Sequence, residues 1–131
     1  MPKLSKQPFD LVKNKSYTLY KLCIDNVCPI DEFIKESEQS PLDESAVKTI
    51  LSRIEHFTDT IRYPLTIFRP IKGTGRDDIF EFKVKRKGTN AVRFYVIKKR
   101  PDMLILLGGS KNSQDKDIRR ITTLVRDINF I

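Results

Sequence analysis

The sequence has little of several residue types that mark common protein classes. Its 131 residues include no Trp, one His, two Cys and five Gly. No run approaches the ~18 uncharged apolar residues of a membrane span, and the N-terminus lacks the apolar stretch of a signal peptide. At 39% hydrophobic, the composition is too apolar for a wholly disordered chain. We therefore expect a soluble, cytoplasmic protein with no membrane association.

The scarce cysteines and the single histidine argue against a metal site. Cys23 and Cys28 have no second pair and no His beside them, which is not a zinc-binding pattern. Without a secretion signal we expect both to be reduced, Cys23 in a strand core and Cys28 in a turn. His56 falls off the apolar stripe of its helix, so we expect it to face solvent. No metal and no cofactor are predicted.

Positive charge is plentiful and unevenly distributed. The chain has 25 Lys and Arg against 17 Asp and Glu, a net charge of +8. Residues 1–61 have 8 basic and 10 acidic side chains, a net charge of −2, whereas residues 62–131 have 17 basic and 7 acidic ones, a net charge of +10. Such an excess attracts polyanions, most simply nucleic acid. A Lys-rich solubilising surface is the alternative explanation.

Apolar spacing predicts an ordered succession of strands and helices. Residues 1–15 are polar, and we expect a flexible N-terminal extension followed by a single domain over 16–131. Alternating runs indicate strands, and apolar residues three or four positions apart indicate helices. The expected elements are a strand over 16–24, a helix over 29–37, a longer helix from Ser40-Pro41 to the break at Tyr63-Pro64, strands over 79–85, 91–98 and 103–107, and a helix from Asn112 or Ser113.

This order indicates an α+β domain with helices on one face of its sheet. We expect a small antiparallel sheet with an N-terminal strand, two N-terminal helices and a C-terminal helix. The central strands alternate, so that Glu81, Lys83 and Lys85 share one polar face. Arg93 and Tyr95 project from the next strand on the face opposite Phe94.

Four segments in the second half of the chain carry a family resemblance. Residues 68–73 (FRPIKG) are similar to the pattern k-P-L-k-G, and 79–83 (IFEFK) to l-y-E-l-R. Residues 92–96 (VRFYV) are similar to y-R-v-f-y, and 104–113 (LILLGGSKNS) to i-v-l-L-h-g-F-K-K-s. In this order they resemble the RelE/ParE superfamily of bacterial toxins, in particular its HigB-like, phage-related branch. The resemblance covers about half of the chain.

The resemblance implies a toxin of a type II toxin–antitoxin system that cleaves mRNA on the ribosome. Its partners would be a cognate antitoxin, the ribosome and mRNA, with no small-molecule cofactor. Cleavage by a ribose 2′-OH needs no metal, but it needs proton transfer and positive charge near the phosphorane. We expect Arg93 to supply that charge, because guanidinium binds phosphate oxygens as a planar fork. Tyr95 would stack on a base or donate a proton, and Lys83 would act as a base or bind phosphate.

Further cations are expected to bind the RNA backbone. They lie on the polar strand face or on loops near the ends of the sheet, and they are Lys72, Arg76, Lys85 and Lys111. The segment 72–76 is not a P-loop, because it lacks the Gly-Lys-Ser/Thr ending and a following helix.

Alternatives remain open at this point. The His or Arg that family members often have after the third strand is Gly108 here, and residues 129–131 contain no Tyr. These departures favour a ParE-like toxin that binds DNA gyrase without cutting RNA. A third possibility is a non-catalytic basic RNA-binding domain on the same scaffold. The charges could also belong to a solvated sheet face, with Glu81 and Arg93 paired across strands.

Overall fold

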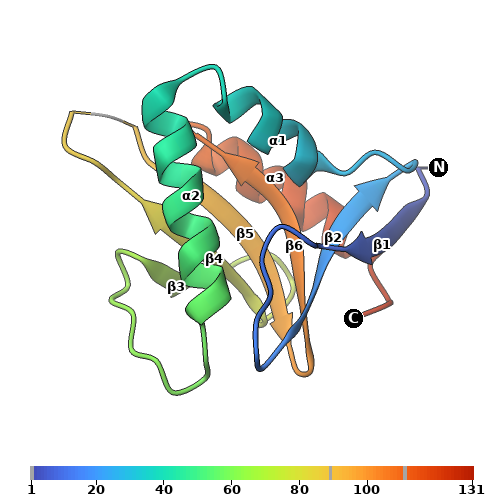
Figure 1. Cartoon of the computed structure of the whole chain (residues 1–131). Helices are drawn as coiled ribbons and strands as arrows, with labels where there is room; N and C mark the ends of the chain where they lie inside the picture. Colours follow the sequence, from blue (N-terminus) through green and yellow to red (C-terminus); the bar gives the residue numbers. More distant parts are fainter. Residues whose placement is uncertain (1, 89, 111) are drawn as a thin grey trace.

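The computed structural model describes residues 2–88, 90–110 and 112–131. The elements are β1 (Leu4–Pro8), β2 (Thr18–Ile24), α1 (Pro29–Ser37), α2 (Pro41–His56), β3 (Phe68–Pro70), β4 (Ile79–Val84), β5 (Val92–Lys99), β6 (Asp102–Gly109) and α3 (Gln114–Val125). The strands form one sheet in the order β1-β2-β6-β5-β4-β3 (Figure 1). None of the helices in these ranges has the length and apolarity needed to cross a bilayer.

The prediction of a small antiparallel sheet is wrong. It has six strands and is mixed, because β2 runs parallel to β6 from Thr18 opposite Asp102 to Lys21 opposite Ile105. The other neighbouring strands are antiparallel. Parallel neighbours need a long connection, and the segment from α1 to β5 supplies one here. Apolar alternation identifies a strand but does not encode its direction, which is why the sequence did not reveal this pairing.

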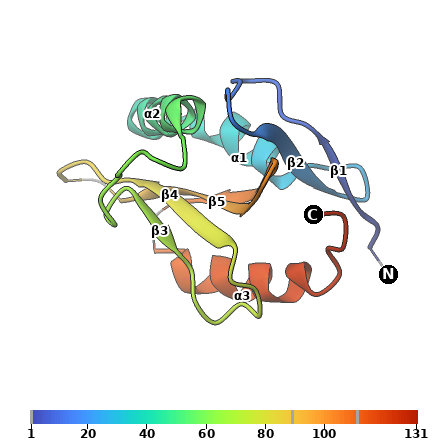
Figure 2. The same ribbon diagram turned by 90° about the horizontal axis from the view of Figure 1, so that it is seen from below.

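The expectation that the helices cover one face of the sheet is also wrong. α1 and α2 pack on one face, and α3 packs on the other (Figure 2). Ile50 of α2 packs in the first core with Phe82 and Phe94. Ile121 of α3 packs in the second core with Tyr95. The molecule therefore has three layers, and both faces of β5 and β6 are buried.

Residues before β2 are attached to the sheet rather than forming a flexible extension. β1 pairs with β2 in antiparallel register, and Phe9 is 4% exposed. Nδ2 of Asn14 donates to the carbonyls of Ile54, at 2.8 Å, and Phe57, at 2.7 Å. These bonds satisfy carbonyl groups that the end of α2 leaves without helical partners. α2 ends at His56, before the expected break at Tyr63-Pro64, and the backbone of Phe57 after it is extended.

The starts of α1 and α2 confirm the sequence-based predictions. Pro29 begins α1, which ends at Ser37 as expected, and Asp31 and Glu32 lie in its first turn. Ser40 caps α2 by accepting from the backbone N–H of Asp43. His56 is exposed, with Nδ1 2.8 Å from the carbonyl oxygen of Ser52, so the expectation that it faces solvent is confirmed.

The two cysteines form a disulfide, contrary to the expectation that they are reduced. Cys23 in β2 is joined to Cys28, the residue that precedes α1. Asp25 and Asn26 between them have φ values of 51° and 68°, so the chain reverses sharply and brings the two cysteines together. The bond links the end of β2 to the start of α1.

Removing this disulfide should destabilise the fold. For so short a loop, the chain-entropy model gives about 2 kcal/mol. We expect Cys23→Ala/Cys28→Ala to lower the free energy of unfolding in urea by about that amount relative to the oxidised wild type. Measuring the reduced wild type as well separates the effect of losing the bond from the effect of replacing the side chains. Equal unfolding midpoints for the oxidised and reduced wild type would contradict the prediction.

Candidate functional site

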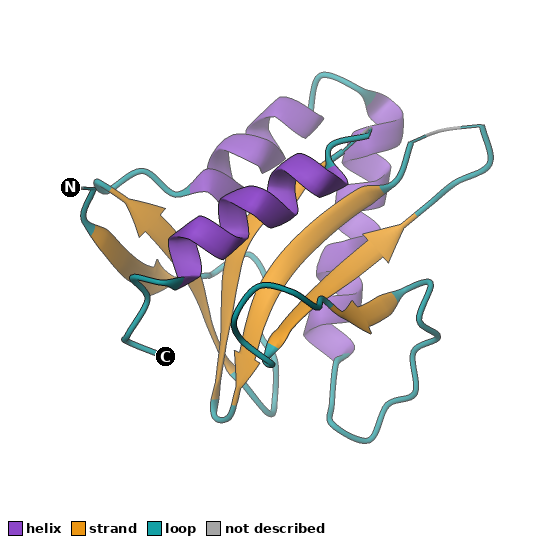
Figure 3. Ribbon diagram, turned by 180° about the vertical axis from the view of Figure 1, so that it is seen from behind, coloured by secondary structure: helices purple, strands orange, loops and turns teal. Residues whose placement is uncertain are grey.

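The three predicted catalytic residues lie on the face of the sheet that α3 covers in part. Lys83 of β4 is directly opposite Arg93 of β5, and Tyr95 follows two positions along β5. Residues directly opposite in an antiparallel pair point to the same face. Figure 3 shows α3 crossing this face and leaving β3, at the edge of the sheet, uncovered. The structure thus brings the three residues together on one face, but they differ in how far they are buried.

Arg93 is engaged by a buried carboxylate. Glu81 has no exposed surface, and the Nε of Arg93 lies 3.7 Å from its Oε2. The same carboxylate accepts from Nε of Arg69 at 2.9 Å and from Nε2 of Gln114, in α3, at 3.0 Å. The Arg93 side chain is only 12% exposed. Its main contact is therefore the cross-strand pairing with Glu81, and an exposed phosphate-binding guanidinium is not observed.

Tyr95 is fully buried beneath the first turns of α3. Its hydroxyl donates to Oδ2 of Asp117 at 3.5 Å, and Oγ of Ser113 donates to the same oxygen at 2.7 Å. Burial, followed by the nearby Asp117 and Glu81 charges, raises the pKa of Tyr95, and burial also raises the pKa of Asp117. With no exposed surface, the Tyr95 ring is not available to stack on a base.

Gly108 occupies the position where the resembling family often has a His or Arg, and Gly109 follows it. A Cβ on Gly108 would lie 2.4 Å from the ring of Phe33 in α1. A Cβ on Gly109 would lie 2.0 Å from Oδ2 of Asp117 in α3. β6 thus approaches a helix on each face of the sheet at consecutive residues. Packing explains the absence of a larger side chain at this point.

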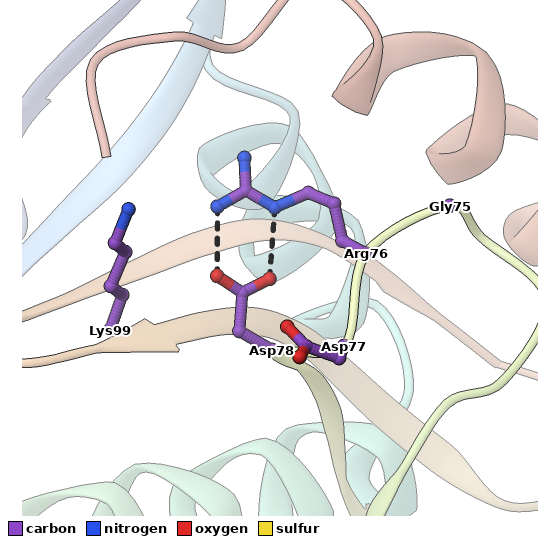
Figure 4. Close-up of a pocket in the computed structure, with 5 residues that line it drawn as sticks. All are labelled: Gly75, Arg76, Asp77, Asp78 and Lys99. Atoms are coloured by element: carbon purple, nitrogen blue, oxygen red, sulfur yellow. Dashed lines mark hydrogen bonds and ion pairs between the residues drawn. The ribbon is translucent and has the colours of Figure 1, made fainter.

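Arg76 was predicted to bind phosphate, but its guanidinium group is bound to Asp78 within the protein (Figure 4). Its Nε and Nη2 donate to the two carboxylate oxygens of Asp78, each at 2.8 Å. Nη1 donates to the carbonyl of Ile128 at 3.4 Å, and Nη2 to that of Ile131 at 3.3 Å. The bidentate bond raises the pKa of Arg76 and lowers that of Asp78. Arg76 therefore fastens the segment after α3 to the loop before β4.

The Arg76–Asp78 pair predicts a pH-dependent stability. Because its pKa is lowered in the folded state, Asp78 stabilises the fold above its ordinary pKa of 3.8, and this contribution is lost in more acidic solution. We expect Asp78→Asn to cost about 1.5–3 kcal/mol at neutral pH, with the difference from wild type shrinking below about pH 4. Urea unfolding across this pH range tests it, with the exposed neighbour in Asp77→Asn as control. A pH-independent difference would contradict the prediction.

The remaining predicted phosphate ligands do not form one cluster. Lys72 is exposed in the loop after β3, and Lys85 is exposed just beyond the end of β4. These two positions lie at opposite ends of β4. Lys111 lies outside the described residues. Sequence reasoning missed Arg69, because β3 has only three residues and shows no clear alternation; its register opposite Glu81 is visible only in the structure.

Arg69, Lys83 and Arg93 form what we call the cationic face. Three adjacent strands supply one cation each, around the single buried carboxylate of Glu81. Arg69, with its side chain 42% exposed, and Lys83, which is partly exposed, are the members that solvent reaches. Like charges opposite one another destabilise an antiparallel pair. Lys83 facing Arg93 is therefore unfavourable for the isolated protein and suited to an anionic ligand.

Within the described residues, no three or more His, Cys, Asp or Glu side chains gather closely enough to hold a metal ion. Comparisons with protein-family models, with curated proteins and with solved structures found no match.

Proposed function

We propose that this protein binds RNA through the phosphate backbone, as a basic domain that does not itself cleave the strand. The observation that carries the proposal is the cationic face, where Lys83 is opposite Arg93 and three cations surround the buried carboxylate of Glu81, with Asp117 as the second carboxylate on this face. Neutralising phosphates with such side chains releases counterions and drives binding. The burial of Tyr95 supports binding without cleavage, because its hydroxyl is held by Asp117 and has no exposed surface.

Fluorescence anisotropy with a labelled single-stranded RNA of about 16 nucleotides tests this proposal. We expect Arg69→Gln/Lys83→Gln to weaken binding about tenfold. The control Lys13→Gln/Lys15→Gln removes the same charge from two exposed positions before β2. A thermal melt of each variant checks that the fold is kept. Equal affinities for the two double variants would refute a role for the cationic face.

The second candidate is the activity that the family resemblance implies, a toxin that cleaves mRNA on the ribosome and is silenced by an antitoxin. It is favoured by the gathering of Lys83, Arg93 and Tyr95 with two carboxylates on one face. Cleavage would require α3 to move, since Tyr95 has no exposed surface. Its place of action would be the cytoplasm, where the Cys23–Cys28 disulfide would be exposed to reducing conditions.

Expression in a bacterial host separates the two candidates. Growth arrest with mRNA cut inside translated frames supports the toxin, and intact mRNA supports binding alone. Lys83→Ala is the informative variant, because the buried ion pair makes Arg93→Ala a change of stability as well as of chemistry. If cleavage occurs, loss of cutting in a well-folded Lys83→Ala variant would place Lys83 in the active site.

A further inference from the structure

A groove with a volume of ≈ 410 Å³ lies between α2 and the outer edge of β4. Lys83 lines this groove and is also a member of the cationic face. Its lining residues come from α2, from the segment before β3 and from the end of β4, and they are Thr49, Arg53, Thr66, Ile67, Lys83, Val84, Lys85 and Arg86. Four of these are cationic and none is acidic. β3 pairs with β4 only as far as Phe82, and beyond that pairing the backbone N–H of Lys83 donates to the carbonyl of Ile67 at 2.8 Å.

Oxygen atoms of the backbone and of hydroxyl groups contact both arginines of this groove. Nη1 of Arg53 donates to the backbone carbonyl of Lys83 at 3.3 Å. Nη2 of Arg86 donates to Oγ of Ser45 at 3.1 Å and to Oγ1 of Thr49 at 3.0 Å. The carbonyl oxygen orients the Arg53 guanidinium without cancelling its charge. The two arginines are therefore positioned before any ligand arrives.

The surroundings of Arg53 differ from those of the arginines that form ion pairs. Arg69, Arg76 and Arg100 each form an ion pair with a carboxylate, at Glu81, Asp78 and Asp59 respectively. Neither Arg53 nor Lys83 takes part in an ion pair within the described part of the chain. The electrostatic potential of the groove is thus less compensated than that around the paired arginines.

From these contacts we infer that the groove is a second binding site for RNA backbone phosphates, continuous with the cationic face. The inference rests on the proposed function and extends it. Lys83 joins the two surfaces: its side chain shares a face with Arg93, and its carbonyl orients Arg53. A single strand that crosses the edge of β4 contacts Arg69 and Lys83 first and then Arg53 and Arg86. Thr66 adds a hydroxyl donor, which binds phosphate oxygens without reading sequence.

The test compares RNA affinity among matched variants by fluorescence anisotropy, with the same labelled single strand. Arg53→Gln/Arg86→Gln removes the groove's guanidinium groups, and we expect about tenfold weaker binding. The control, Arg126→Gln/Lys72→Gln, removes equal charge beside the loop that precedes β4, at the opposite end of that strand. Thr66→Glu adds an anion to the groove without disturbing the arginines, and Thr123→Glu on α3 is its control. We expect only the groove variants to lose affinity.

The outcomes separate this inference from the proposed function. No RNA binding by the wild type would contradict the proposed function itself. RNA binding by the wild type that both groove variants retain would overturn the groove site alone. Tighter wild-type binding to double-stranded DNA, lost in the same variants, would assign the groove to DNA and would also overturn the inference.

Discussion

Glu81→Gln is expected to destabilise the protein by about 3–5 kcal/mol, because it removes the counter-charge of a buried guanidinium. Glu81 has no exposed surface, and Arg93 beside it is 12% exposed. The amide keeps the shape of the carboxylate but leaves the positive charge of Arg93 uncompensated in a poorly solvated place. The loss of the counter-charge costs less at Arg69, since its side chain is 42% exposed and water can solvate it.

Urea unfolding of the purified variant measures this effect. Glu55→Gln, an exposed glutamate on α2, is the matched control and should lie within about 0.5 kcal/mol of wild type. Replacing both partners in Glu81→Met/Arg93→Met should recover part of the loss, because the one charge it leaves unpaired, that of Arg69, is on a side chain that water reaches. If Glu81→Gln unfolds at the wild-type midpoint, Glu81 is not the buried counter-ion that the structure places there.

Affinity for single-stranded RNA is expected to fall about 50-fold between about 50 and 200 mM salt. The reason is the number of cations on the proposed path, namely Arg53, Arg69, Lys83 and Arg86. Each phosphate neutralised on a single strand contributes about 0.7 to the slope of log affinity against log salt, so four contacts give a slope near −3. Anisotropy titrations at several salt concentrations supply the slope. An affinity independent of salt would mean that backbone charge does not drive the interaction.

The central strands show which features of the fold could be predicted from the sequence alone. The alternation in 79–85 and 91–98 correctly predicted β4 and β5, and the placing of Arg93 and Tyr95 opposite Phe94 is confirmed. The same pattern misled at Glu81, which was expected on a polar face and is fully buried. Alternation identifies the two faces of a strand, but only the position of α3 decides that both are covered.

A signal for the second helical layer was nevertheless present in the sequence. Residues 103–107 form an uninterrupted apolar run, and all five are buried. Continuous apolar strands are typical of sheets covered on both faces. β1, in contrast, left little trace, because Leu4–Pro8 is polar, ends in proline and pairs along one edge only. Its place depends on tertiary contacts such as the bond from Nζ of Lys6 to the carbonyl of Phe130.

The candidate site shows a similar division. Composition located the excess of positive charge in residues 62–131, and Lys83 was identified from its strand face. The sequence did not reveal which arginines form ion pairs with carboxylates. Arg76 and Arg93 are paired with Asp78 and Glu81, whereas Arg53 of α2, far away in sequence, lies beside Lys83. Such partnerships depend on tertiary packing, so no local pattern encodes them.

The salt dependence of RNA binding by the wild type and by Arg69→Gln/Lys83→Gln, measured side by side, tests the role of the cationic face most directly. Loss of two phosphate contacts should reduce the magnitude of the slope by about 1.4. Identical slopes for the two proteins would show that RNA does not contact these side chains, and the cationic face would then have no part in the function of this protein.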